Sequence, residues 1–107
     1  MKLYFYIFDS YNKKIKKGEA EVIEKSKTYK PVDKFPKGFY GCYVRKEDVG
    51  HLTGYSSNTV ILTEDKPKVA INLFIQKHKA AASKAVKELD RQNAAIDYLQ
   101  KWRAEHE

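Results

Sequence analysis

Cysteine is almost missing from this sequence, since Cys42 is the only one in 107 residues. A single cysteine forms no disulfide within the chain and cannot supply a cysteine-rich metal cage. The three histidines, His51, His78 and His106, lack metal-ligand spacing, and no motif joins any of them to a nucleophile. We therefore expect no metal, no cofactor and no catalytic residue, and we expect Cys42 to be a buried, unreactive thiol.

Long apolar runs are missing as well. No stretch approaches the roughly 20 apolar residues that span a bilayer. The apolar run at residues 3–8 has neither the length nor the cleavage pattern of a signal peptide. We therefore expect a cytoplasmic protein with no membrane partner.

Glycine is absent from residues 66–107, and the only proline there, Pro67, stands near the start. The segment is rich in Ala, Lys, Leu, Glu and Gln, which are good helix formers. It predicts one long helix, or two stacked helices if the chain turns near residues 91–93. A single helix of this length would extend about 60 Å, more than a small sheet can cover. Its outer half must find a partner, fold back or stand in water.

The first 65 residues have the alternation and turn chemistry of short strands. Strands are expected at residues 3–8, 19–24, 39–45 and 59–63, with a short extended segment at residues 26–32. The order of strands followed by a helix predicts a single α+β domain over residues 1–107. Its β-rich part is residues 1–65, an antiparallel sheet of about four strands, followed by a long C-terminal helix at residues 66–107.

The expected helix has two parts of different character. Residues 69–75 are apolar nearly all round, so we expect this part to lie deep against the sheet. Farther along, a narrower apolar seam recurs in alternating steps of four and three residues, which is typical of helices that pair. The outer half is therefore expected to bind a second copy, forming a dimer, or another protein. Its candidate association surface is Ala82, Ala85, Leu89, Ile96, Leu99 and Trp102.

Charge and aromatic content allow a second reading. The net charge is +7, and the sequence holds eight tyrosines and five phenylalanines. Sheets bind single-stranded nucleic acid by stacking bases on aromatic rings that are flanked by cations. The alternative prediction is therefore a basic, tyrosine-rich sheet face that binds nucleic acid. Its candidate contacts are Tyr4, Tyr6, Tyr29, Tyr40, Tyr43, Lys27, Lys30 and Arg45.

Three short segments carry a resemblance to other proteins: residues 27–29 (Lys-Thr-Tyr), residues 45–50 (Arg-Lys-Glu-Asp-Val-Gly) and residues 59–62 (Thr-Val-Ile-Leu). Followed by a long charged helix, they resemble short uncharacterised proteins of phages and prophages of low-GC bacteria. The resemblance implies an accessory or host-takeover protein that acts by binding. The sequence thus predicts a non-enzymatic binding protein working through protein–protein contacts, with nucleic-acid binding as the alternative.

Overall fold

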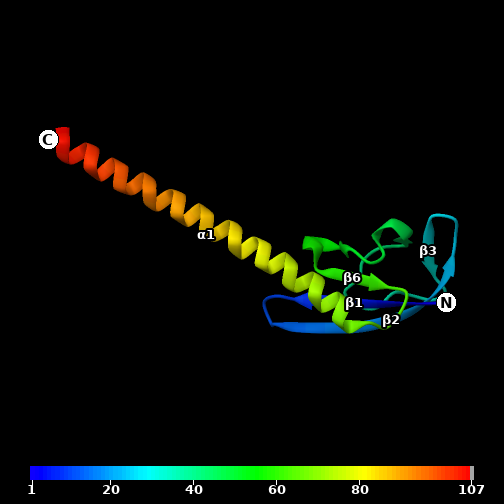
Figure 1. Cartoon of the computed structure of the whole chain (residues 1–107). Helices are drawn as coiled ribbons and strands as arrows, with labels where there is room; N and C mark the ends of the chain where they lie inside the picture. Colours follow the sequence, from blue (N-terminus) through cyan, green and yellow to red (C-terminus); the bar gives the residue numbers. More distant parts are fainter. Residues whose placement is uncertain (107) are drawn as a thin grey trace. The chain divides into compact units, whose positions relative to one another are not determined.

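The computed structural model describes Met1 to His106, except for the side chain of Tyr55, and contains an antiparallel sheet and one long helix. The strands follow the order β4-β3-β2-β1-β6-β5 (Figure 1). The predicted α+β class is confirmed, but the sheet has six strands rather than about four. The elements are β1 (Lys2–Asp9), β2 (Lys14–Glu24), β3 (Thr28–Pro31), β4 (Val44–Arg45), η1 (Lys46–Asp48), β5 (Leu52–Thr53), η2 (Tyr55–Ser57), β6 (Thr59–Leu62) and α1 (Pro67–His106).

Strand β1 lies inside the sheet, between β2 and β6, and side chains on both of its faces are covered. One face packs Leu3 and Phe5 in a core cluster with residues of β2, β3, β4 and β6. The other face places Tyr6 in a second cluster with Val60 and with the start of α1. A strand covered on both sides reads as an unbroken apolar run, which is why residues 3–8 were recognisable.

The hairpin from β1 to β2 explains why β2 is longer than predicted. The Asp9 carboxylate accepts hydrogen bonds from the backbone N–H groups of Tyr11 and Asn12, and Lys13 adopts a positive φ of 55°. This tight turn starts β2 at Lys14, so the lysine-rich residues 14–17 pair with β1. Their side chains are exposed, so no apolar alternation marks them as a strand.

The expected strand at residues 39–45 is wrong, because only Val44 and Arg45 form β4. Phe39 instead lies in a loop and places its ring 5.2 Å from that of Phe5 and 5.0 Å from that of Phe35. The loop carries Cys42 on the surface, so the prediction of a buried thiol is wrong as well. The alternation of apolar and polar residues in this glycine-containing segment is weak, and packing of the Phe39 ring in the core is more favourable than a strand here.

The first two turns of α1 cover the second core cluster. Ala70 and Phe74 are buried there and Leu73 is half-buried, whereas Val69, Ile71 and Ile75 are exposed. The prediction that residues 69–75 lie against the sheet is therefore confirmed for Ala70, Leu73 and Phe74 and wrong for Val69, Ile71 and Ile75. A helix on a sheet buries one stripe only, and the described chain places no second layer over the other side.

Chain contacts divide the protein into two compact units, Met1–Ile75 and Gln76–Glu107. The first unit contains the sheet, both core clusters and the first turns of α1. The second consists, as far as it is described, of the rest of α1, which continues without a break at residues 91–93. Within the described residues, α1 is long enough to cross a bilayer but too polar to do so.

Candidate functional site

The outer segment of α1, residues 76–106, has no buried residue within its described part. Large apolar side chains lie among these exposed positions: Leu89 is 60% exposed, Ile96 51%, Leu99 62% and Trp102 52%. Ala82 and Ala85 are exposed too. All six residues predicted as an association surface thus lie on one helix and face solvent.

Helix geometry places most of these side chains along one seam. Residues separated by alternating steps of three and four stay on one side of a helix. Ala82, Ala85, Leu89, Ile96 and Leu99 follow this pattern, with Gln92 as the polar position between Leu89 and Ile96. We call this set, Gln92 included, the seam. An exposed apolar stripe of this kind is what a paired helix buries.

Trp102 lies beside the seam rather than in it, three residues after Leu99. Its ring stacks on the ring of His106, with centroids 4.0 Å apart and planes 14° apart. The His106 Nδ1 atom lies 2.8 Å from the Trp102 carbonyl oxygen, which holds the imidazole in place. The stack covers part of the indole and leaves the rest at the edge of the seam.

The polar position of the seam is fixed by a neighbour. The Gln92 amide donates to the Glu88 carboxylate at 2.9 Å, and Arg91 Nη2 donates to the same oxygen at 2.8 Å. These hydrogen bonds, from Gln92 first and Arg91 second, lower the pKa of Glu88. The polar position of the seam thus has a hydrogen-bond partner on its own helix.

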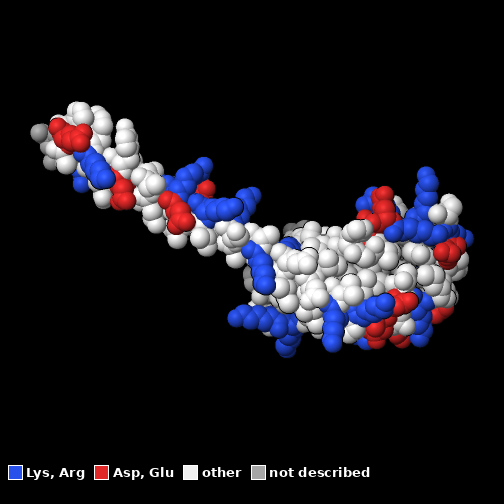
Figure 2. Space-filling view, viewed as in Figure 1, with Lys and Arg blue, Asp and Glu red and all other residues white. Residues whose placement is uncertain are grey.

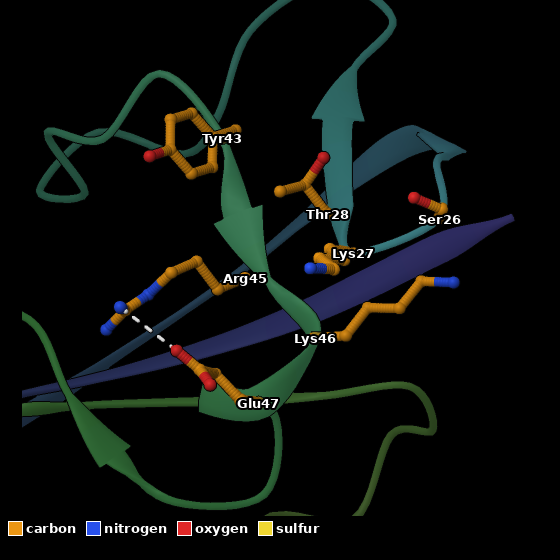
Figure 3. A pocket seen from close by; sticks show the side chains of 7 residues that line it. All are labelled: Ser26, Lys27, Thr28, Tyr43, Arg45, Lys46 and Glu47. Carbon is orange, nitrogen blue, oxygen red and sulfur yellow. Dashed lines mark ion pairs between the residues drawn. The ribbon is translucent and has the colours of Figure 1, made fainter.

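A second candidate site is a basic pocket of about 610 Å³ in the sheet unit. Its lining residues come from the β2–β3 turn, β3, the loop before β4, β4 and η1, and Figure 3 labels all of them. The pocket exists because β3 and β4 pair, with Thr28 opposite Arg45. The residues that line it are Ser26, Lys27, Thr28, Tyr43, Arg45, Lys46 and Glu47.

Ion pairs neutralise part of the charge in this basic pocket. Arg45 is 3.0 Å from both Glu47 and Asp48, and the hydrogen bond with Asp48 raises the pKa of its guanidinium. Lys46 pairs with Glu24 at 3.3 Å. Among the described ion pairs none involves Lys27, so its ammonium is the cation of the pocket most open to an incoming anion.

The structure brings three predicted nucleic-acid contacts together in this pocket: Lys27, Tyr43 and Arg45. Tyr43 is 49% exposed and offers a ring for stacking. Lys30 is exposed on β3 but does not line the pocket. Sequence reasoning missed Lys46, Ser26 and Thr28, because only the pairing of β3 with β4 shows that they share an opening.

The predicted tyrosine-rich sheet face is not formed. Tyr6 is 2% exposed and Tyr29 7% exposed, so neither ring is available for stacking. Tyr4 packs against the second core cluster, and Tyr40 lines a different pocket, next to Gly38 and Gly41. Tyr29 and Tyr6 are core residues instead, one in each of the two core clusters.

The basic side chains of the sheet unit are also dispersed. On the side that Figure 2 shows, Lys and Arg lie at several separate places, with Asp and Glu among them. Strand β2 illustrates the mixture, because Lys17 pairs with Asp65 and Lys2 with Glu19 at 3.4 Å. Within the described residues, no three His, Cys, Asp or Glu side chains group as metal ligands.

Comparison with protein-family models, with curated proteins and with solved structures gave no match to this chain. The candidate sites are therefore interpreted from their own geometry.

Proposed function

We propose that this chain is a non-enzymatic binding protein that acts through protein contacts made by the seam of α1. The observation that carries the proposal is the exposure of Leu89, Ile96 and Leu99 on one side of a helix. Full burial of an exposed Leu or Ile side chain is worth about 1.5–3 kcal/mol, and an interface would bury the roughly half of each side chain that is still exposed. A partner helix gives these side chains the apolar neighbour that the described part of their own unit lacks.

Helix stability gives a second reason. Long helices in water rely mainly on tertiary packing rather than on intrinsic propensity. Residues 76–106 have no buried residue within the described chain, and the ion pair between Glu88 and Arg91 lies on the helix surface. A partner on the seam supplies the missing packing, so association and helix stability support each other.

The context we propose is that of the phage and prophage proteins that the sequence resembles. Accessory proteins of that kind act by binding, which agrees with an exposed apolar seam. The resemblance contributes the biological setting, and the exposed seam contributes the site.

Paired substitutions on one helix turn test this proposal. Leu99→Glu places a charge in the seam, and Tyr98→Glu places the same charge on the opposite side, where Tyr98 is exposed. We expect Leu99→Glu to lower protein association of the full chain at least tenfold in sedimentation velocity, and Tyr98→Glu to leave it unchanged. Equal behaviour of both variants, in self-association and in binding to a purified protein partner, would show that the seam is not a contact surface.

Nucleic-acid binding is the second candidate function, and the observation that favours it is the basic pocket. Lys27 offers an ammonium for a phosphate, and Tyr43 offers a ring for a base. Stacking of this kind contributes about 1–3 kcal/mol per base. The proposal differs from the original prediction in that the site is one pocket rather than a whole sheet face.

Fluorescence anisotropy with a labelled single-stranded oligonucleotide tests the second candidate. Lys27→Ala and Tyr43→Ala should each weaken binding about fivefold or more, and affinity should fall steeply with added salt. Lys30→Ala is the matched control, because it removes a lysine of β3 outside the pocket. Absence of any binding at low salt would rule the pocket out as a nucleic-acid site.

A further inference from the structure

The apolar side chains of the outer α1 segment differ in size between its two halves. The first half carries small residues on and beside the seam: Ala81, Ala82 and Ala85. The second half carries large ones: Ile96, Leu99 and Trp102. All six are exposed in the single chain. A surface that is shallow at one end and bulky at the other matches itself when two copies run in opposite directions.

We propose that the seam binds the seam of a second copy of this chain in antiparallel register, with Leu89 facing Gln92 of the second copy at the centre. The inference rests on the proposed function and names its partner. Four residues before Leu89 is Ala85, and four residues after Gln92 of the second copy is Ile96, so these two residues face each other. Three residues farther in the same directions, Ala82 faces Leu99 of the second copy. The alternating spacing is therefore kept on both chains.

In this register each of these three alanines meets a large residue. Ala85 packs against Ile96 of the second copy, and Ala82 packs against Leu99. Ala81 lies beside the seam, where it meets Trp102 of the second copy. Apolar interfaces are packed as densely as protein interiors, so a large side chain needs a shallow site opposite. The alanines provide that site along the whole first half.

A parallel pair lacks this match. It places each residue against its own copy, so Ala82 and Ala85 meet alanine, whereas Ile96 and Leu99 meet residues of equal bulk. The axial distance between packed helices depends on the side chains at the contact. Two straight helices would then be close at one end and far apart at the other, which leaves gaps in the alanine half.

Charge favours the same orientation. Residues 76–87 contain four lysines and no acid, namely Lys77, Lys79, Lys84 and Lys87. Residues 94–105 contain two bases and two acids, namely Lys101, Arg103, Asp97 and Glu105. A parallel pair brings the two lysine segments together well within the Debye length of about 10 Å at 0.1 M salt. The antiparallel pair places each lysine segment beside a neutral one.

The register also fits the length of the segment. When Leu89 faces Gln92, Gln76 lies opposite Glu105 of the second copy, so the overlap begins where the second unit begins. The overlap covers about 30 residues, or roughly 45 Å of helix. The seam, at residues 82–99, lies in the middle of this overlap. Charged groups that border uncharged surface are visible along this helix in Figure 2.

Single-cysteine variants of the full chain test orientation directly, in a Cys42→Ser background because Cys42 is exposed. Ala85→Cys and Ile96→Cys chains are mixed and treated with a short bismaleimide, and the products are identified by mass. We expect the mixed product to exceed either self-linked product at least fivefold. Self-linking of each variant without a mixed product would establish a parallel pair and overturn the proposal.

A second pair of positions leaves the packed residues unchanged. Val86 and Asn93 flank the seam on the same side, so they meet across an antiparallel interface and not across a parallel one. A mixture of Val86→Cys and Asn93→Cys chains should therefore give the mixed product. Ala80→Cys mixed with Tyr98→Cys is the matched control on the opposite side of the helix, and it should give none.

The outcomes separate this inference from the proposed function. If no mixed product forms and the chain stays a single copy at high micromolar concentration, antiparallel self-pairing is wrong. The proposed function then still stands if Leu99→Glu, but not Tyr98→Glu, abolishes binding to a different, purified protein partner. If neither variant changes any protein association, both the inference and the proposed function fail.

Discussion

The Tyr6 hydroxyl donates a hydrogen bond to the Asp65 carboxylate at 2.5 Å, linking the centre of the sheet to the residues just before α1. Asp65 also forms an ion pair with Lys17 of β2. Three segments far apart in the sequence, β1, β2 and the start of α1, are thus joined by one carboxylate. This contact ties the residues just before α1 to β1 and β2.

The Tyr6 contact predicts a loss of stability at alkaline pH. Burial of the ring and the hydrogen bond to Asp65 raise the pKa of Tyr6 above its usual value of 10.0. Such a group stabilises the folded state below about pH 10, and the contribution is lost as the pH rises further. Tyr6→Phe should therefore lower stability at pH 7 and show a flatter decline above pH 10 in urea titrations. Tyr11→Phe, at an exposed ring, should follow the wild type, and equal alkaline slopes for all three proteins would contradict the assignment.

The Asp65 carboxylate predicts a change at the acid end. Hydrogen bonds from Lys17 first, and from Tyr6 second, lower the pKa of Asp65 below its usual value of 3.8. Its contribution is present above about pH 4 and is lost as the pH falls through the folded-state pKa. Asp65→Asn should be less stable than the wild type at pH 7, and the difference should shrink as the pH falls below 4. A difference in urea midpoint that is constant from pH 7 to pH 2 would show that the ion pair is not involved.

Gly18 predicts a steric defect in β2. A Cβ atom at this position would lie 2.6 Å from Pro36 Cβ and 2.8 Å from Pro36 Cγ. Gly18→Ala should therefore push the loop that holds Phe35 away from the sheet and lower the free energy of unfolding by about 1–3 kcal/mol. Lys16→Ala, an exposed change in the same strand, should stay within about 0.5 kcal/mol. Thermal unfolding of both variants measures the effect, and a Gly18→Ala protein as stable as wild type would argue against this close approach.

If Ala82 faces Leu99 of the second copy, substitutions that exchange their sizes should have non-additive effects on the free energy of dimer formation. Ala82→Leu overfills the antiparallel pair by about 1–3 kcal/mol, and Leu99→Ala leaves a cavity worth roughly 2–5 kcal/mol. The double variant restores one large and one small residue in each pair, so its dimer affinity should recover most of the loss. Sedimentation equilibrium gives the three affinities. Losses that simply add in the double variant would mean that residues 82 and 99 do not face each other.

The pattern of apolar residues along the sequence predicted β1 and α1, which depend mainly on neighbouring residues. Residues 3–8 were recognisable because both faces of β1 are apolar, and α1 was recognisable because nothing interrupts it. The two-residue strands β4 and β5 carry no alternation, so their existence depends on pairing partners that the sequence does not show. Phe39 lies in a loop rather than in the expected strand, because its ring packs in the core against Phe5.

The candidate sites divide in the same way. The seam is a periodic property of one helix, so its residues were identified correctly as exposed positions of α1. The basic pocket depends on the register of β3 against β4, which brings Lys27 beside Arg45 and Tyr43. Burial of Tyr6 and Tyr29 depends on how the core is filled, and tyrosine content alone does not distinguish a stacking surface from a core.

The fluorescence of Trp102 tests the central claim, that the seam binds the seam of a second copy, most directly. Trp102 is the only tryptophan, is 52% exposed and lies at the edge of the seam. Its emission in the full chain should shift to shorter wavelength as concentration rises and association covers the indole. Leu99→Glu should prevent the shift, and Tyr98→Glu should leave it intact. An emission maximum that is the same from nanomolar to high micromolar concentration, and the same in both variants, would contradict the account.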